Sequence, residues 1–171
     1  MRLFFALWPD VEVRRKLGAL AGTLAERARG KPVPEAKVHM TLAFLGEVPV
    51  ERFAAACDAA SRIEGQGFDI VLDEVGSFRA ARVAWAGSSR GHPALAELQS
   101  NLARELGAEG FALESRPFAA HVTLVRHAGS TIARAAITPI VWRVGQFVLV
   151  ASDTGRGTYE VAKMWKLGPG P

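Results

Sequence analysis

The stretch His39-Met40-Thr41-Leu42, within VHMTLAFLGEV, recurs 82 residues later as His121-Val122-Thr123-Leu124, within FAAHVTLVRH. Both copies lie in apolar runs with the length and composition of β-strands. Alternate side chains of a strand point to opposite faces, so each copy places its His and its Thr on one face. If two similar lobes carry these strands and face each other, the two His-Thr pairs line a cleft from opposite walls.

The other face of each motif strand is predicted to pack into the core. Strand alternation assigns to this face Val38, Met40, Leu42 and Phe44 in the first copy, and Val122 and Leu124 in the second. Arg126 has the same parity as these core residues. It can reach the cleft only if its strand ends or bulges before that position, as strands often do beside active sites.

The remaining sequence predicts short strands interspersed with helices. Strands are expected over residues 2–8, 37–45, 68–78, 82–86, 121–126, 141–151 and 158–167, and helices over 11–29, 49–63 and 93–106. Residues 127–139 predict a loop with one helical turn. Because the strands are short and joined locally, we expect an α+β fold with mainly antiparallel sheets. A helix upstream of each motif strand favours two pseudo-symmetric lobes.

Length and composition limit the class of protein. A chain of 171 residues is expected to form one domain, residues 1–171. Its formal net charge of +4 suits an anionic ligand without identifying one. The single cysteine, Cys57, argues against a disulfide framework and a Cys-based zinc site. No signal peptide or membrane-spanning run is recognisable, so we expect a cytoplasmic protein without membrane contacts. A cleft between two lobes of one chain needs no second copy, so we expect a monomer.

Two histidines across a cleft suit an in-line displacement at phosphorus. A neutral imidazole can take a proton from attacking water while a protonated one gives a proton to the leaving oxygen. The ordinary pKa of histidine, about 6.5, permits both forms near neutral pH. The Thr hydroxyls and a nearby cation can hydrogen-bond the non-bridging oxygens. His-x-Thr is not a usual set of metal ligands, so we expect no metal site.

The paired motif resembles the signature of the 2H phosphoesterase superfamily. RLFFAL at the start, HMTLAFLGEV, HVTLVRH, and FVLVAS followed by TYEV all look like its RNA 2′,3′-cyclic phosphodiesterase branch, the LigT-like or 2′-5′ RNA ligase family. The resemblance covers essentially the whole chain. It implies two lobes with curved antiparallel sheets that face a cleft, with helices outside.

The resemblance also implies an activity and its residues. The activity is hydrolysis of a ribose 2′,3′-cyclic phosphate to a 2′-phosphate, without metal or other cofactor. By motif position His39 and His121 would be catalytic, and Thr41 and Thr123 would bind phosphate together with Arg126. The usual family assignment makes the first His the acid toward the 3′ oxygen and the second the base for water; sequence and symmetry leave this division open.

Base recognition is the least defined part of the predicted site. The family counterpart of Phe5 lies near the cleft, so Phe5 is a candidate to stack on a base, with strand core as the alternative interpretation. Relatives often have an aromatic residue where this chain has the segment 31–34, and a Glu where Ala151 stands. These departures concern base recognition and late-strand contacts rather than catalysis.

Three hypotheses about function remain open from the sequence. The first is an enzyme acting on RNA with a 2′,3′-cyclic phosphate end. The second keeps the site but acts on a small cyclic nucleotide or a 2′-5′ linkage, including reversible 2′-5′ RNA ligation. The third is a non-catalytic RNA-binding module, although a pure binder would not need a His in both motifs.

Overall fold

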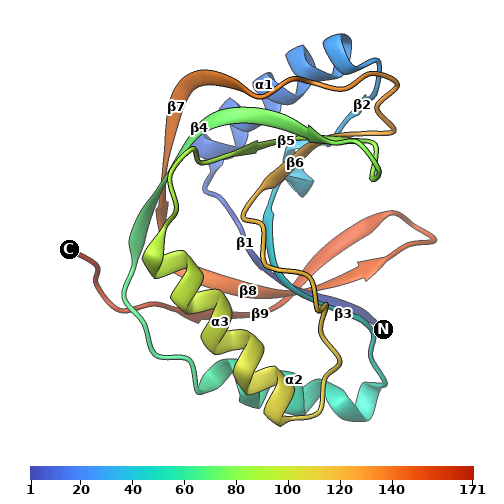
Figure 1. The fold of residues 1–171 in the computed structure, drawn as a ribbon. Coiled ribbons are helices and arrows are strands. Elements are labelled where there is room, and N and C mark those ends of the chain that lie inside the picture. Colours follow the sequence, from blue (N-terminus) through green and yellow to red (C-terminus); the bar gives the residue numbers. More distant parts are fainter.

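The structure, a computed structural model, describes residues 1–171 as three α-helices and one sheet of nine strands (Figure 1). The helices are α1 (Val11–Ala28), α2 (Phe53–Ser61) and α3 (Pro93–Ala108), with short 3₁₀ helices at Glu35–Lys37 and Val50–Arg52. The strands are β1 (Arg2–Leu7), β2 (Lys31–Pro32), β3 (Met40–Glu47), β4 (Phe68–Phe78), β5 (Val83–Gly87), β6 (Val122–Arg126), β7 (Ala135–Val144), β8 (Gln146–Asp153) and β9 (Thr158–Lys166). All pairs between these strands are antiparallel, as the predicted α+β class requires.

The sheet has two halves that meet at the motif strands. The strand order is β7-β4-β5-β6-β3-β1-β8-β9. The motif strands β6 and β3 are therefore the central neighbours, with three further strands on the outer side of each. In Figure 1 the β4-β5-β6-β7 half forms the upper lobe and the β1-β3-β8-β9 half the lower one. The N-terminal α1 covers the upper lobe, whereas α2 and α3 cover the lower lobe. The lobes therefore exchange helices and do not correspond to the two halves of the sequence.

The two motif strands touch at a single residue pair and then diverge. Met40 of β3 pairs with Val122 of β6, and no further pair joins these strands. Beyond this point β2 takes the place beside β6, with Lys31 opposite Arg126 and Pro32 opposite Val125. This divergence opens the space between the lobes.

A β-bulge occurs at the Leu of both motif copies. In the β1–β3 pairing, Phe5 and Ala6 oppose Ala43 and Thr41, which leaves Leu42 as the extra residue. In the β5–β6 pairing, Ala84 and Trp85 oppose Val125 and Thr123, which leaves Leu124 as the extra residue.

Both bulged leucines are buried, and their carbonyl groups accept hydrogen bonds from outside the partner strand. Leu42 O accepts from Gln99 Nε2 at 3.3 Å, and Leu124 O accepts from Val33 N at 2.8 Å. The trailing Leu of the motif thus resets the strand alternation in each lobe.

Local sequence signals explain the long helix that leads into this region. Asp10 caps α1 by accepting a hydrogen bond from Val13 N at 2.9 Å, and the buried positions of α1 recur at helical spacing. The helix ends at Arg29, whose left-handed φ of 50° lets the chain turn immediately toward β2.

The main core is a cluster of 39 buried residues, to which each of the three α-helices contributes. A separate cluster of four residues, Phe4, Ala6, Val148 and Val150, lies on the other face of β1 and β8. None of the helices combines the length and apolar character needed to cross a bilayer.

The structure corrects the predicted elements in the last third of the chain. Residues 127–139 contain no helical turn; β7 begins at Ala135 and pairs with β4. Pro139 lies within β7 at an irregularity of the β4–β7 pairing, where it has no partner residue on β4. Because no ladder hydrogen bond is made there, the missing N–H of Pro139 costs none. The strand expected over 141–151 is two strands, because Gly145 separates β7 in one lobe from β8 in the other.

Smaller differences concern the starts of elements. The first motif strand begins at Met40 rather than at residue 37, since Glu35–Lys37 form a 3₁₀ turn. The helix expected from residue 49 begins with another 3₁₀ turn. Phe44 is not on the core face: the bulge at Leu42 turns its ring outward, where it is 45% exposed.

Gly30 is expected to be essential for the position of β6. A Cβ at this residue would lie 2.5 Å from Val125 Cγ1 and 2.9 Å from Arg126 O, because the chain passes closely against the bulged strand. We predict that Gly30→Ala lowers the free energy of unfolding by about 1–3 kcal/mol. Urea unfolding measures this, and Gly22→Ala, where nothing lies within 4 Å, is the matched control. Equal stability of the two variants would contradict the prediction.

Candidate active site

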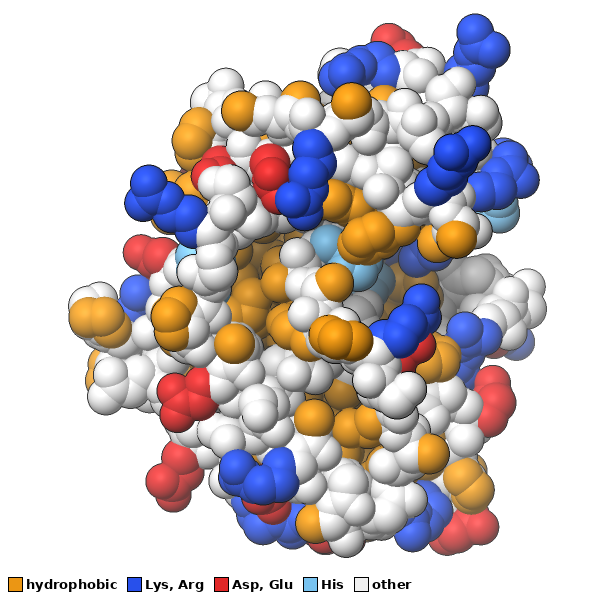
Figure 2. Space-filling view, in the orientation of Figure 1, with side chains coloured by type: hydrophobic (Ala, Val, Ile, Leu, Met, Phe, Trp, Pro, Cys, Tyr) orange, Lys and Arg blue, Asp and Glu red, His pale blue; other side chains and the backbone are white.

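A cleft of about 710 Å³ opens between the two lobes, and residues of both His-x-Thr motifs line it. In Figure 2 histidine atoms lie in a hollow near the middle of the molecule, with Lys and Arg side chains on its rims. His39, Thr41, His121 and Thr123 all line this cleft. Continuing the antiparallel register from the Met40–Val122 pair sets His39 across from Thr123 and Thr41 across from His121.

The two histidines are oriented by the same backbone contact. His39 Nδ1 lies 2.6 Å from Lys37 O, and His121 Nδ1 lies 2.7 Å from Ala119 O. A carbonyl oxygen can only accept, so each Nδ1 carries a proton and donates it. The proton that each ring gains or loses is therefore the one at Nε2.

Burial lowers the pKa of both histidines. For His39 the pKa falls from 6.5 to about 4; desolvation is the largest cause, and the positive charge of Arg126 and the proximity of His121 contribute. The hydrogen bond to Lys37 O opposes this shift. Desolvation and Arg126 also lower the pKa of His121. Both rings are therefore neutral near pH 7 when the cleft is empty, and a bound anion would favour their protonated forms.

Aromatic rings account for much of the burial of His39. Trp8 stacks on the imidazole with a centroid distance of 5.4 Å and an interplanar angle of 8°. Phe4 and Tyr159 contact the same imidazole at 4.9 and 5.6 Å. In the other lobe, the edge of Phe78 meets His121 at 4.8 Å. These rings remove water from the histidines while leaving room for a ligand in the cleft.

The cleft is positively charged. Four cations line it, Arg2, Lys31, Lys37 and Arg126, against one carboxylate, Asp153. None of the four forms an ion pair, whereas Asp153 is paired with Arg156 at 3.8 Å. Lys37 Nζ instead donates to Gly157 O in the β8–β9 turn. Unpaired cations in a concave site attract an anionic ligand.

Arg126 reaches the cleft because of the bulge in its strand. The extra residue Leu124 shifts the alternation, so Leu124 and Val125 are both buried and Arg126 is exposed toward the cleft. The bulge in β3 has the same effect on Phe44. Phe44 follows Thr41 by three residues, as Arg126 follows Thr123, and both side chains line the cleft. The strand β6 thus bulges before Arg126, as it must for this side chain to reach the cleft.

The stacking role considered for Phe5 is wrong. Phe5 is fully buried and contacts Phe147 and Trp165 on the core side of β1, so it cannot meet a base. Its neighbour Phe4 points to the other face of β1 and lines the cleft. Strand alternation from a core-facing Leu3 would have selected Phe4 from the sequence.

Several residues of the cleft were missed by the sequence reasoning. His127 lines the cleft from the end of β6, where its φ is 55°. Lys31 and Lys37 line it through the segment before β3, and Ser152 and Tyr159 through the β8–β9 hairpin. No spacing in the sequence connects these segments, so only the sheet order could reveal them. His92 lies outside the cleft, with Nε2 3.0 Å from Ser88 Oγ.

The structure contains no group of three or more His, Cys, Asp or Glu side chains arranged to hold a metal ion. The two motifs give the cleft two imidazoles and two hydroxyl groups, and several cations line it beside them. A site of this kind can bind a phosphate group and exchange protons on both sides of it.

A two-lobed antiparallel sheet whose central strands carry twin His-x-Thr motifs defines a phosphoesterase of the 2H type. Comparison with known proteins makes this specific. Residues 7–85 match the model of the family described as LigT like Phosphoesterase. The chain is 35% identical over 172 aligned residues to the RNA 2′,3′-cyclic phosphodiesterase of Escherichia coli K12, covering 97% of this chain and 96% of the relative. The chain belongs to the LigT-like phosphoesterase family.

Solved structures agree with this assignment. E. coli LigT complexed with 3′-AMP superimposes with a TM-score of 0.87 at 34% identity, covering 97% of each chain. The protein TT0787 of Thermus thermophilus superimposes with a TM-score of 0.83 at 27% identity, covering 99% of each chain. These matches extend the likeness to both lobes, including the second motif, which lies beyond the residues matched by the family model.

The lowered pKa of His39 predicts how stability depends on pH. Below pH 6.5 the unfolded chain binds a proton at this residue that the folded chain, with a pKa of about 4, does not bind. The free energy of unfolding therefore falls as the pH drops through this window, by about 2 kcal/mol between about pH 7 and pH 5 from His39 alone. Urea unfolding of the wild type and of His39→Gln measures the difference. An equally steep pH dependence in the variant would contradict it.

Proposed function

We propose that the protein is an RNA 2′,3′-cyclic phosphodiesterase that hydrolyses 2′,3′-cyclic phosphate ends to 2′-phosphates. The observation that supports this best is the pair of histidines in one cationic cleft, each with Nδ1 bonded to a carbonyl group and Nε2 left for proton transfer. The curated relatives from E. coli and Thermus thermophilus carry the name of this activity. The cleft volume of about 710 Å³ is that of a nucleotide-sized site.

In the proposed reaction water attacks phosphorus opposite the 3′ oxygen. His121 Nε2 takes a proton from the water, and protonated His39 gives one to the 3′ oxygen as the P–O3′ bond breaks. The products are a 2′-phosphate and a free 3′ hydroxyl, and the protein regains its initial protonation after the two histidines exchange one proton with solvent. The pseudo-twofold arrangement about the Met40–Val122 pair supports this proposal, because a phosphate bound between the motif strands would have one His-Thr pair on each side.

The remaining groups would bind the phosphate oxygens. Thr41 and Thr123 offer hydroxyl donors, and Arg126 offers a guanidinium group that can contact two oxygens at once. The phosphate charge would also favour the protonated His39 that the reaction needs. Because Arg126 and burial favour neutral histidines in the empty cleft, the substrate anion itself would raise the pKa of the acid His39 when it binds.

The central prediction concerns the two histidines and the product. With a nucleoside 2′,3′-cyclic phosphate in the presence of EDTA, we expect turnover that yields only the 2′-phosphate isomer, identified by phosphorus NMR. His39→Ala and His121→Ala should each lower kcat about 10²–10⁴-fold. The double variant should lose little more than either single one, because the two groups act as a unit.

The histidine outside the cleft provides the control for this experiment. His92→Gln should keep wild-type turnover, since His92 contacts Ser88 and not the cleft. Absence of turnover by the wild type on both the mononucleotide and RNA ends would contradict the proposal. A product with the phosphate on the 3′ oxygen would contradict the proposed direction of cleavage.

A second prediction separates the acid from the base. A phosphodiester with a 4-nitrophenolate leaving group needs no proton on the leaving oxygen, so loss of the general acid should matter little for it. On this substrate His39→Ala should recover most of the activity that it loses on a cyclic phosphate, whereas His121→Ala should stay impaired. If the activity of His121→Ala recovers instead, His121 is the acid and His39 the base. If the activity of neither variant recovers, the assignment of one acid and one base is contradicted.

A further inference from the structure

A second groove, of about 570 Å³, lies beside the cleft in the upper lobe. One wall is the β4–β5 turn, with Arg79 and Arg82, and the other is the loop after β6, with Ser130 and Thr131. The proposed reaction gives no role to these residues. The groove carries two cations and no carboxylate.

The two walls of the groove are held in place by hydrogen bonds. Ala128 N donates to Arg82 O at 2.9 Å, and Arg82 Nε donates back to Ala128 O at 3.1 Å. Ser130 N donates to Ala28 O at the end of α1, and Ile132 N donates to Ser77 Oγ, each at 2.8–2.9 Å. The groove is therefore part of the folded scaffold.

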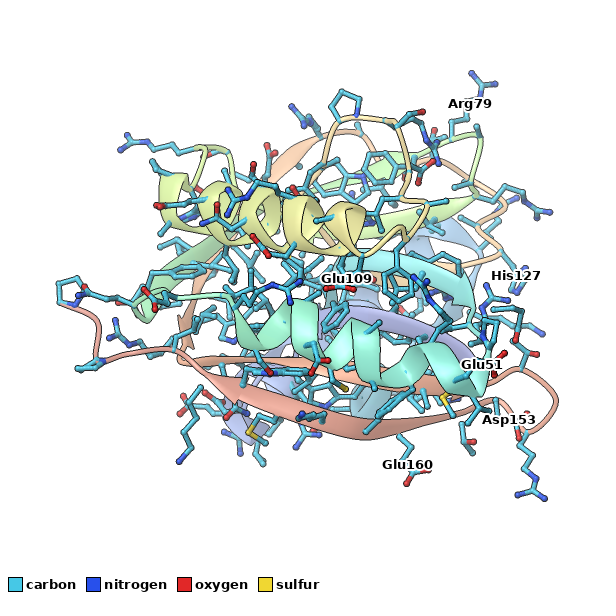
Figure 3. The ribbon with its side chains drawn as sticks, turned by 90° about the horizontal axis from the view of Figure 1, so that it is seen from below. Glu51, Arg79, Glu109, His127, Asp153 and Glu160 are labelled. Atoms are coloured by element: carbon cyan, nitrogen blue, oxygen red, sulfur yellow. The ribbon has the colours of Figure 1, made fainter.

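The groove continues directly from the cleft. Phe78 lines the groove and contacts His121, which lines the cleft, at 4.8 Å. His127 lines the cleft, and the next residue, Ala128, lines the groove. In Figure 3 Arg79 and His127 lie along the same side of the molecule, with Arg79 at the tip of its hairpin and pointing to solvent.

The two cations of this groove have no counter-charge. Arg79 and Arg82 form no ion pair, as is also true of Arg2 and Arg126 in the cleft, and no carboxylate lines the groove. The opposite rim of the cleft includes Asp153 at the end of β8, the only carboxylate that lines the cleft, and Asp153 pairs with Arg156. A polyanion that leaves the cleft along the groove would meet two cations and no carboxylate.

We propose that this groove binds the sugar-phosphate backbone of the RNA chain that precedes the terminal cyclic phosphate. Arg79 and Arg82 would contact phosphates, Ser130 and Thr131 would offer hydroxyl donors, and Phe78 would bridge the groove and the reaction centre with an aromatic surface. This inference rests on the proposed function and specifies its substrate: an oligonucleotide end is preferred to a cyclic mononucleotide.

The test compares a nucleoside 2′,3′-cyclic phosphate with a short oligoribonucleotide that ends in the same group. The wild type should have the higher kcat/KM on the oligonucleotide. Arg79→Gln should lower that value about 3–10-fold, reduce the slope of its logarithm against log salt by about 0.7, and leave the mononucleotide unchanged. Arg79→Lys, which keeps the charge, should retain most of the oligonucleotide preference.

Arg15→Gln is the matched control, because Arg15 is exposed on α1 far from Ala28, the end that contacts the groove. Equal effects of Arg79→Gln on both substrates, or no effect on either, would overturn the groove assignment while leaving the proposed function intact. If the wild type turns over neither substrate, the proposed function fails. Fluorescence anisotropy with an oligoribonucleotide ending in a 2′-phosphate then decides the groove alone: weaker binding by Arg79→Gln supports it, and unchanged binding overturns it.

Discussion

The single antiparallel contact between Met40 and Val122 is the constraint on which the rest of the structure depends. It joins two four-stranded halves, and because only one pair is made, the strands can diverge into a cleft. The residues on either side of this contact are the His and Thr of each motif. A sheet that continued its pairing would fill this space with backbone hydrogen bonds and leave no site.

The paired bulges explain why the motif includes a Leu. At Leu42 and Leu124 the strand gains a residue, the leucine stays buried, and the residue three positions after the Thr is turned to the cleft. That residue is Phe44 in one lobe and Arg126 in the other. The backbone is therefore similar in the two lobes, whereas the side chains differ. The lower lobe contributes Phe44 and the three aromatic rings around His39, and the upper lobe contributes Arg126.

The protonation of the two histidines depends on whether the cleft holds an anion. Aromatic packing and Arg126 keep both histidines neutral, which suits a base but not an acid. Four unpaired cations meanwhile attract an anion whose charge favours protonation. In the proposed reaction a bound phosphate group would therefore favour the acid form. The Nδ1 contacts with Lys37 O and Ala119 O leave Nε2 as the atom that gains or loses a proton.

The sequence by itself determined the elements with strong periodicity, the α+β class, and the placement of His39, Thr41, His121 and Thr123 along one cleft. A repeated local pattern predicts this placement because it records which side chains share a face. It could not determine the bulges, which change that pattern through pairing with another strand, and so it misplaced Phe44 and left Arg126 conditional. It also selected Phe5 where Phe4 faces the cleft. Only the tertiary structure revealed the exchange of helices between lobes and the contributions of Lys31, Lys37, His127 and Tyr159, since these depend on which distant segments the sheet brings side by side.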